Sequence, residues 1–416
     1  MKKFAVAALA AAVLFSLVWV TGPARRARTP QALVEGLAGS DAVNCFAELN
    51  QNEDESVTAA IIAGTRHRRA RVRSQCARLL GQRQDVELVS ALTPLLADSD
   101  TGVSNSAARA LVPLLDDEEL LSLLRDSHLT PASQLVMAAT LLRDPTTLTN
   151  TAFVDWLLDR SHSSETRRGA YQAIRARHSP CYGEKKLEKE NLPAVLTARQ
   201  RILVQARQDG FDPACEESVR CSALPLYATL RGSSAYSELL PVLKADSPQL
   251  REAALVAIGA SKDERALALF TQIARDSAEM DSFRMVALAG LRARIQAGNQ
   301  DAEIFKLFCQ LAQDKQQATP VRAAAMGSLR VFRFDPEALA IARQGLSDKE
   351  PSVRQRAAIA VAALGDKNAR LGERNALEPS LIQLKLALAV EGDAEARCAL
   401  EGAVCTLQGR IASRGK

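Results

Sequence analysis

A short residue pattern recurs along most of this chain and constrains the fold more than any other feature. Its clearest copy spans residues 348–366 and reads DKEPSVRQRAAIAVAALGD. Pro351 suits the first turn of a helix, because its missing N–H would have no partner there. Gly365 stands where a left-handed C-cap would end that helix. Apolar side chains between the two fall on one face at helical spacing. The stretch predicts a polar turn followed by a short helix buried mainly on one side.

The copies align on one position, which we term the anchor. At Arg354, apolar Val353 comes one residue before, small Ala357 three after and aliphatic Val361 seven after. Most anchors stand roughly 31 to 33 residues apart, and a period of this length indicates stacked helical units that cannot bury their apolar faces alone. Ser104 and Leu135 hold the anchor in two degenerate copies. Arginine holds it in the others: Arg73, Arg167, Arg220, Arg251, Arg284, Arg322 and Arg354.

A second amphipathic run precedes the anchored helix, and a polar turn joins the two. Such runs cover residues 87–96, 236–243, 264–274, 302–312 and 336–346, and the turns carry Asp98, Asp246, Asp276, Asp314 and Asp348. Each repeat thus has an aspartate in the turn, followed by Val-Arg, small residues and Leu-Gly. This pattern resembles HEAT repeats, particularly the short bacterial PBS-lyase HEAT-like kind, over roughly residues 40–408. The resemblance implies an all-α protein, a right-handed armadillo/HEAT-like α-solenoid of about ten helical hairpins.

The first residues predict an export segment. Lys2 and Lys3 precede an uninterrupted apolar run over residues 4–20, which is the layout of a secretory signal. The run is long for a signal peptide and short for a spanning helix, so a cleaved signal and a membrane anchor both stay open for residues 1–24. We expect an extracytoplasmic protein that is periplasmic, secreted or anchored, with membrane contact only through this segment.

Composition argues against one class of partner. Apolar residues make up 47% of the chain and aromatic residues only 4%. The formal net charge is +5, or about +3 without Lys2 and Lys3, which is too mild to imply nucleic acid. Aromatic side chains for base stacking are also scarce. We therefore expect no nucleic-acid partner.

Positive charge is concentrated in one stretch, residues 66–83. It holds seven arginines and one histidine with no acid among them. A solvated ridge is the favoured interpretation, because charge runs usually face water. The alternative is an anion patch for acidic protein, phospholipid headgroup or wall polymer, whose binding would weaken with salt. Its candidate residues are Arg66, Arg68, Arg69, Arg71 and Arg73.

The recurring anchor arginines allow two interpretations. They could form a row of guanidinium groups facing one ligand. Alternatively, each could bind the turn Asp of its own or the next repeat through charge-assisted hydrogen bonds and so connect the hairpins. The resemblance to HEAT repeats favours this structural role for all seven.

The domain organisation follows from the spacing. We expect a basic linker and the start of an N-terminal cap at 25–40, repeats at 41–177, an inserted loop-helix segment at 178–218, repeats at 219–366, a capping hairpin at 367–408 and a basic tail at 409–416. Insertions in solenoids often build the binding site. The insertion is therefore the best local candidate for partner specificity, with a surface hairpin that binds nothing as the equal alternative.

Eight cysteines in an exported chain suggest disulfides. Cys181 and Cys215 bracket the insertion and are the preferred pair, with Cys221 as a competing partner. Cys45 with Cys76 is a further possibility. Cys398 and Cys405 would lie about two turns apart on one helix, too far to bridge unless the helix breaks.

Known catalytic motifs are lacking in the sequence. It has no Gly-rich phosphate loop, nucleophile elbow or HExxH, and its four histidines are scattered. We expect no catalytic residue, cofactor or metal. The preferred function is a non-catalytic protein-binding scaffold or adaptor of the bacterial envelope that holds its partner along the concave face. The alternatives are a lyase-like or modifying enzyme that uses a Cys or His of the insertion, and a binder of an anionic envelope polymer through the 66–83 ridge.

Overall fold

The computed structural model describes residues 28–126, 129–143, 145–177, 193–296, 301–332, 335–370 and 377–413, and all regular structure in these ranges is helical. The chain divides into two compact units. Unit 1 comprises Met1–Ala173 with Lys186–Val195, and unit 2 comprises Ile174–Lys185 with Leu196–Lys416. The N-terminal export segment lies outside the described residues, so it stays a prediction.

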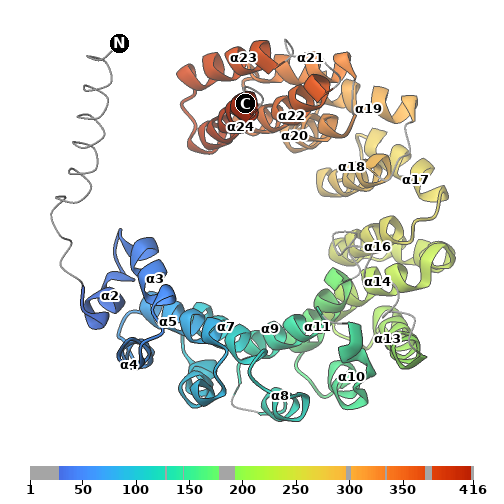
Figure 1. Ribbon diagram of the computed structural model, residues 1–416. Coiled ribbons are helices and arrows are strands. Elements are labelled where there is room, and N and C mark those ends of the chain that lie inside the picture. Colours follow the sequence, from blue (N-terminus) through green and yellow to red (C-terminus); the bar gives the residue numbers. More distant parts are fainter. Residues whose placement is uncertain are drawn as a thin grey trace, which may run out of the picture. The chain divides into compact units, whose positions relative to one another are not determined.

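In unit 1, successive helical hairpins stack side by side (Figure 1). The first helices of the hairpins form one layer, and the second helices, which carry the anchors from α5 onward, form the other. The first helices are α2 (Pro30–Gly36), α4 (Glu55–Gly64), α6 (Val89–Leu92), α8 (Asp117–Leu124) and α10 (Thr151–Leu158). The second helices are α3 (Ala42–Gln51), α5 (Ala70–Arg83), α7 (Thr101–Leu111), α9 (Pro131–Leu141) and α11 (Ser164–Arg177). Short 3-10 turns lie at η1 (Val86–Leu88), η2 (Thr93–Ala97) and η3 (Pro145–Thr149).

Unit 2 repeats the same two-layer arrangement. Its first helices are α13 (Pro193–Phe211), α15 (Ala235–Leu239), α17 (Arg265–Arg275), α19 (Ala302–Gln313), α21 (Pro336–Gly345) and α23 (Leu377–Val390). Its second helices are α14 (Glu217–Arg231), α16 (Pro248–Ala260), α18 (Asp281–Gln296), α20 (Thr319–Ser328), α22 (Pro351–Arg370) and α24 (Ala394–Ser413). The 3-10 turns are η5 (Gly232–Ser234), η6 (Leu240–Lys244) and η7 (Leu329–Val331).

The core confirms the repeat pattern position by position. Every residue three or seven places after an anchor is at most 2% exposed. The small residues are Cys76, Ala107, Ala138, Ala170, Ala223, Ala254, Ala287, Ala325 and Ala357, and the larger ones are Leu80, Leu111, Leu142, Ile174, Tyr227, Ile258, Leu291, Leu329 and Val361. Small side chains let neighbouring second helices approach closely. At Gly81 of α5, even a Cβ would come within 2.5 Å of Ala110 Cβ.

Side-chain caps mark where many of the helices begin. Asp100 accepts hydrogen bonds from the backbone N–H groups of Gly102 and Val103 at the start of α7, and Asp116 forms a capping box with Glu119 at α8. Neutral caps also occur, such as Thr130 before α9. Each cap satisfies backbone donors that have no partner within the helix.

Several predicted boundaries differ from the structure. The expected helices at 87–96 and 236–243 break into short α and 3-10 pieces, because Pro94 and Pro241 cannot donate an internal hydrogen bond. Helix α22 continues through Gly365 instead of ending there. Glycine costs only about 1 kcal/mol inside a helix, and no proline follows it closely. Residues 409–413, predicted as tail, continue α24.

The predicted insertion at 178–218 contains a regular element. Helix α13 occupies most of its second half and packs against α14, where Phe211 and Tyr227 make an edge-to-face contact with ring centroids 5.5 Å apart. Gly210 lies close to Leu224 of the same neighbour. The segment 193–211 is therefore the first helix of a further hairpin. Residues 178–192 lie outside the described part of the chain.

Candidate functional site

Five anchor arginines connect one hairpin to the turn of the next, a contact that we term the inter-hairpin contact. In α5, Arg73 donates to both oxygens of Asp98, over 2.7 Å each. The other contacts, all in unit 2, are Arg251 to Glu279 at 3.2 Å, Arg284 to Gln317 at 2.7 Å, Arg322 to Asp348 at 2.5 Å and Arg354 to Glu391 at 2.6 and 2.7 Å. Arg220 instead donates to the carbonyl oxygen of Gly210 at 3.4 Å, and Arg167 lies half-buried on α11.

Two of the predicted turn aspartates have a different role. Asp276 accepts from the backbone N–H of Ala278, and Asp314 accepts from that of Gln316. They hold their own turns in shape, as aspartate commonly does. The anchor arginines of the preceding hairpins reach residues three positions further on, Glu279 and Gln317.

The inter-hairpin contacts shift the acidity of their carboxyl groups. The hydrogen bonds from Arg354 lower the pKa of the buried Glu391 to about 2. The hydrogen bonds from Arg73 likewise lower the pKa of Asp98. Each carboxylate is thus stabilised in its charged form by the guanidinium that it binds.

The cysteines do not form the alternative pairs. Cys45 and Cys76 are separate buried thiols, and burial raises the pKa of Cys76 to about 12. Burial is also the main cause that raises the pKa of the half-buried Cys221, which disfavours a reactive thiolate there. Cys398 and Cys405 are separate thiols on the unbroken α24. The preferred pair stays a prediction, because Cys181 lies outside the described residues while Cys215 is buried.

Metal and membrane sites can be assessed only for the ranges given above. Within them, no group of three or more His, Cys, Asp or Glu side chains is placed to hold a metal ion. Nor does any helix in these ranges have both the length and the apolar character needed to cross a membrane.

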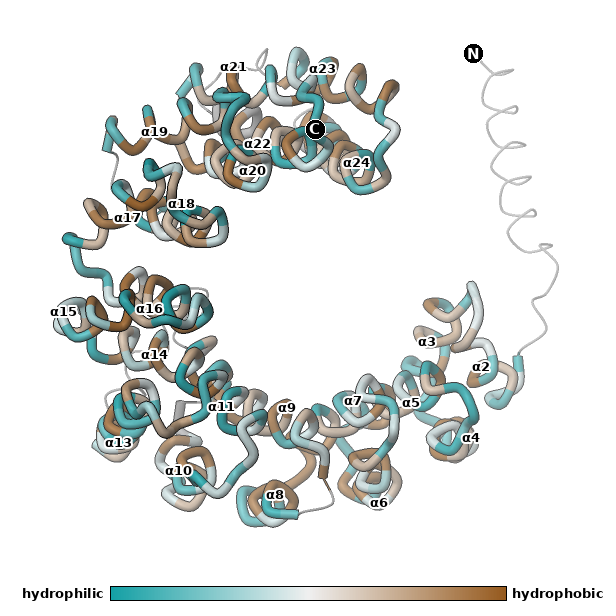
Figure 2. Tube along the Cα trace, turned by 180° about the vertical axis from the view of Figure 1, so that it is seen from behind, coloured by the Kyte–Doolittle hydropathy of each residue, from teal (hydrophilic) through white to brown (hydrophobic). Residues whose placement is uncertain are grey.

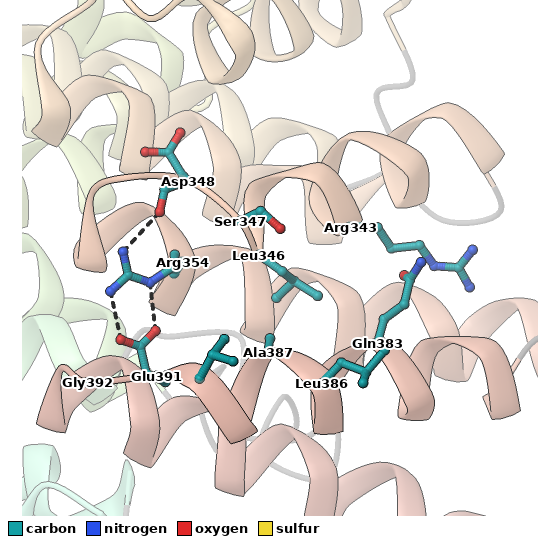
Figure 3. A pocket seen from close by; sticks show the side chains of 11 residues that line it. Arg343, Leu346, Ser347, Asp348, Arg354, Gln383, Leu386, Ala387, Glu391 and Gly392 are labelled. Atoms are coloured by element: carbon teal, nitrogen blue, oxygen red, sulfur yellow. Dashed lines mark hydrogen bonds and ion pairs between the residues drawn. The ribbon is translucent and has the colours of Figure 1, made fainter.

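A groove of about 580 Å³ lies beside the last described hairpin (Figure 3). Leu346 and Ser347, after α21, form one side, and Gln383, Leu386, Ala387 and Val390 of α23 form the other. Figure 3 shows Arg354 and Arg343 toward opposite ends, with Leu346 and Ala387 between them. The groove thus combines an apolar middle with charged ends, the usual make-up of a site that binds a partner with defined orientation.

The end at Arg354 is fully satisfied. Besides binding Glu391, Arg354 donates to the carbonyl oxygens of Asp348 and Lys349 at 2.9 and 3.0 Å. Glu391 also accepts from the backbone N–H of Asp393 at 2.9 Å. These bonds fix the two turns that border the groove, so this end is a rigid wall.

The opposite end has an unsatisfied donor. Arg343 Nη2 donates to Ser380 Oγ at 2.8 Å, but its buried Nε has no hydrogen-bond partner in the described part of the chain. Burial also lowers the pKa of Arg343. A buried donor without an acceptor costs about 1–3 kcal/mol, so Arg343 is held in this position at some cost to stability.

Helix α23 exposes an unusual amount of apolar surface. Ile382, Leu386 and Val390 are 58%, 65% and 85% exposed, and their spacing of four residues places them on one side of the helix. Figure 2 shows mostly brown, apolar residues along α23. Such a cluster on a helix of a stacked layer marks a surface for another molecule.

Sequence reasoning missed this site but a signal was present. In α23 the run LIQLKLALAV carries apolar residues around the whole helix, with no polar face. A short helix of that kind must be buried or covered.

The fold defines an α-solenoid of stacked helical hairpins. Residues 58–143 match the family model for HEAT repeats, so this part of the chain is built of HEAT repeats. The match does not distinguish the PBS-lyase subgroup, which stays a prediction. No curated protein matches the chain.

Solved structures with similar helical arrays include the karyopherin Kap121p bound to Pho4p, at 15% identity and a TM-score of 0.39, covering 96% of this chain and 47% of Kap121p. A homology model of the full-length AP-3 complex shows 13% identity and a TM-score of 0.38, covering 100% of this chain and 84% of that one. The chain thus spans about half the length of Kap121p. Likeness at this level says nothing about function.

Proposed function

We propose that this chain is a non-catalytic protein-binding scaffold of the bacterial envelope, and that it holds an apolar helical segment of its partner in the groove beside α23. The observation that carries the proposal is the row of exposed Ile382, Leu386 and Val390, of which Leu386 and Val390 line a groove with rigid turns. The apolar run at residues 4–20 supports the envelope location.

The partner's chemistry follows from the groove. Aliphatic residues four positions apart on the partner would pack against Leu386 and Val390, as in other helix-in-groove complexes. A carbonyl or carboxylate oxygen at one end would pair with the half-buried guanidinium of Arg343, which lines the groove. The apolar contacts would supply affinity, and the single polar contact would set the direction of the bound segment.

The groove lies beside the first-helix layer of unit 2. The sequence analysis favoured the concave face and the insertion as the binding region. On the second-helix layer the exposed large apolar residues include Val256 and Met285, each just over a third exposed. They make a smaller apolar surface than α23, so α23 is the stronger candidate.

The test is site-specific photocrosslinking in native cells. A photoreactive residue at Leu386 should form an adduct with one envelope protein. The same residue at Lys385, exposed on the same helix but outside the groove, should form none. Leu386→Glu should abolish an adduct formed from Gln383, whereas Lys385→Glu should leave it intact. An adduct between two copies of the chain, or none at Leu386, would refute the proposal.

A further inference from the structure

A separate cationic surface lies in unit 1, at the turn between α4 and α5. It consists of Arg66, Arg68, Arg69 and Arg71, which we term the arginine loop. All four side chains are exposed, and within the described part of the chain none of their guanidinium groups makes a hydrogen bond or ion pair. The polar turn is teal in Figure 2. Four free guanidinium groups within six residues make a strong local positive field.

The backbone of the arginine loop is held in place. Arg73 Nη1 donates to the carbonyl oxygens of His67 and Arg68 at 2.9 and 3.1 Å, while its other nitrogens bind Asp98. The backbone N–H of Arg69 donates to His67 Nδ1 at 3.0 Å. Arg73, predicted as part of the anion patch, thus supports the loop and is itself neutralised.

The local sequence supplies no acid to offset this charge. Residues 56–84 contain no Asp or Glu. Of the acids on neighbouring segments, Asp98 binds Arg73 and Glu35 lies 3.2 Å from His67 Nε2. In addition, α5 begins without a side-chain cap and without an acid in its first turn. Its positive end therefore adds to the field of the arginines.

This arrangement is unfavourable for the isolated helix. Basic residues at a helix N-terminus oppose the helix dipole, and the equivalent start of α7 carries Asp100 instead. A helix start that carries basic residues and no acid to offset them is unfavourable for folding, and such unfavourable positions are expected at functional sites. An anion bound at the loop would supply the missing compensation.

We propose that the arginine loop binds the phosphate groups of anionic phospholipid at a membrane surface. Arginine pairs with phosphate in a planar, two-bond geometry. The loop contacts α2 through His67 and Glu35, and α2 begins ten residues after the apolar run at 4–20 ends. Ten residues span at most about 35 Å, so a membrane that holds the N-terminal segment is within reach. The turn has no aromatic residue, so the contact stays at the level of the headgroups.

This inference rests on the proposed envelope location for the source of lipid, but it does not use the groove. The tested residues are in unit 1 and the groove residues are in unit 2. Failure of one proposal is therefore distinguishable from failure of the other.

The experiment is vesicle flotation with the full chain, comparing phosphatidylglycerol with phosphatidylcholine. The ratio between the two compositions cancels any insertion of the N-terminal segment that they share. Wild type should prefer phosphatidylglycerol, and high salt should remove the preference. Each Arg→Glu change should lower the preference at least about fivefold, and R66E/R68E/R69E/R71E should abolish it.

A control variant makes the same change in net charge elsewhere. Lys244, Lys315, Lys349 and Lys385 are exposed residues of unit 2, and their combined change to Glu should keep most of the preference. Circular dichroism checks that both variants stay folded. Equal binding of wild type to both lipids would overturn the proposal, as would equal loss in the two variants. If millimolar inorganic phosphate competes with the vesicles, the loop binds a free anion and the proposal is wrong. If the loop binds an acidic protein but no vesicle, its ligand is a protein and the proposal is also wrong.

Discussion

The two units stack the same kind of hairpin with different inter-hairpin chemistry. In unit 2, four successive anchors donate to the next turn, and three of their acceptors are the carboxylates Glu279, Asp348 and Glu391. In unit 1, the two anchors that follow Arg73 are Ser104 and Leu135, which cannot make an ionic contact. There, the carbonyl oxygen of Leu124 accepts from Gln134 Nε2 at 2.9 Å and from Trp156 Nε1 at 3.1 Å.

This difference distinguishes the interactions that specify the fold from those that only modify its stability. The residues three and seven places after each anchor are buried in both units. Burial of small and aliphatic side chains is therefore common to the whole array and supplies its main driving force. The inter-hairpin contact is ionic in one unit and neutral in part of the other, so it should set how each unit responds to pH and to substitution.

The largest effect is expected at Arg322. Its side chain is only 2% exposed and binds the nearly buried Asp348. Arg322→Ala removes that partner and leaves a cavity, so the free energy of unfolding should fall by about 3 kcal/mol or more. Urea unfolding followed by circular dichroism measures it. Ser104→Ala, at the equivalent anchor of unit 1, is the matched control and should cost clearly less. Similar losses in both variants would erase the distinction between the units.

The pH dependence of Glu391 should be the next largest effect. Because Arg354 lowers its pKa from 4.5 to about 2, this carboxylate stabilises the fold above about pH 4.5 and the contribution disappears as the pH falls toward 2. The full contribution is roughly 3 kcal/mol. Glu391→Gln should therefore lower stability at neutral pH and flatten its decline in acid. Unfolding free energies at several pH values test this, with exposed Glu303→Gln as the control. An unchanged acid profile in Glu391→Gln would contradict it.

A smaller effect is expected at the neutral contact in unit 1. Trp156→Phe removes one of the two hydrogen bonds to the Leu124 carbonyl, but Gln134 still satisfies that oxygen. The loss should be about 1 kcal/mol, and it should not change between acid and neutral pH. Gln134→Ala together with Trp156→Phe should cost more than the two single changes added, because the carbonyl is then without either donor. Strict additivity in this double-mutant cycle would count against a shared acceptor.

The smallest effect is expected at the exposed side of α23. Leu386→Glu should change the free energy of unfolding by less than about 0.5 kcal/mol, since the side chain is largely in water. Leu384→Ala, at a fully buried position of the same helix, should cost about 2–5 kcal/mol. A large loss for Leu386→Glu in thermal unfolding would mean that the row packs within the unit and is not available to a partner.

Much of the fold could be predicted because it depends on local spacing. Arg354, Ala357 and Val361 define a template whose buried positions are all confirmed. Helix ends were less predictable, since the continuation of α22 past Gly365 depends on propensities that differ by about 1 kcal/mol. The partners of Arg251 and Arg284 could not be predicted from the sequence either. A turn offers several acceptors, and the conformation of its backbone determines which one the arginine reaches.

The candidate groove could not be predicted for a different reason. Its apolar helix was recognisable in the residues 377–390, but the separation between α21 and α23 that leaves Leu386 exposed depends on how the last hairpin is placed. The arginine loop, by contrast, was visible as a run without acids. The structure adds that Asp98 binds Arg73 and that Arg73 holds the backbone of the loop.

Hydrogen exchange measured at about pH 6 and at about pH 3 tests the central contrast most directly. The account predicts that protection factors fall first in α22, which carries Arg354, and in α24, which follows Glu391, because below about pH 4.5 the opened state gains a proton that the folded carboxylate does not bind. Protection should persist in α9 and α10, whose caps Thr130 and Asn150 and whose contacts to Leu124 are neutral. Loss of protection in α9 and α10 before α22 and α24, or at the same pH, would contradict it.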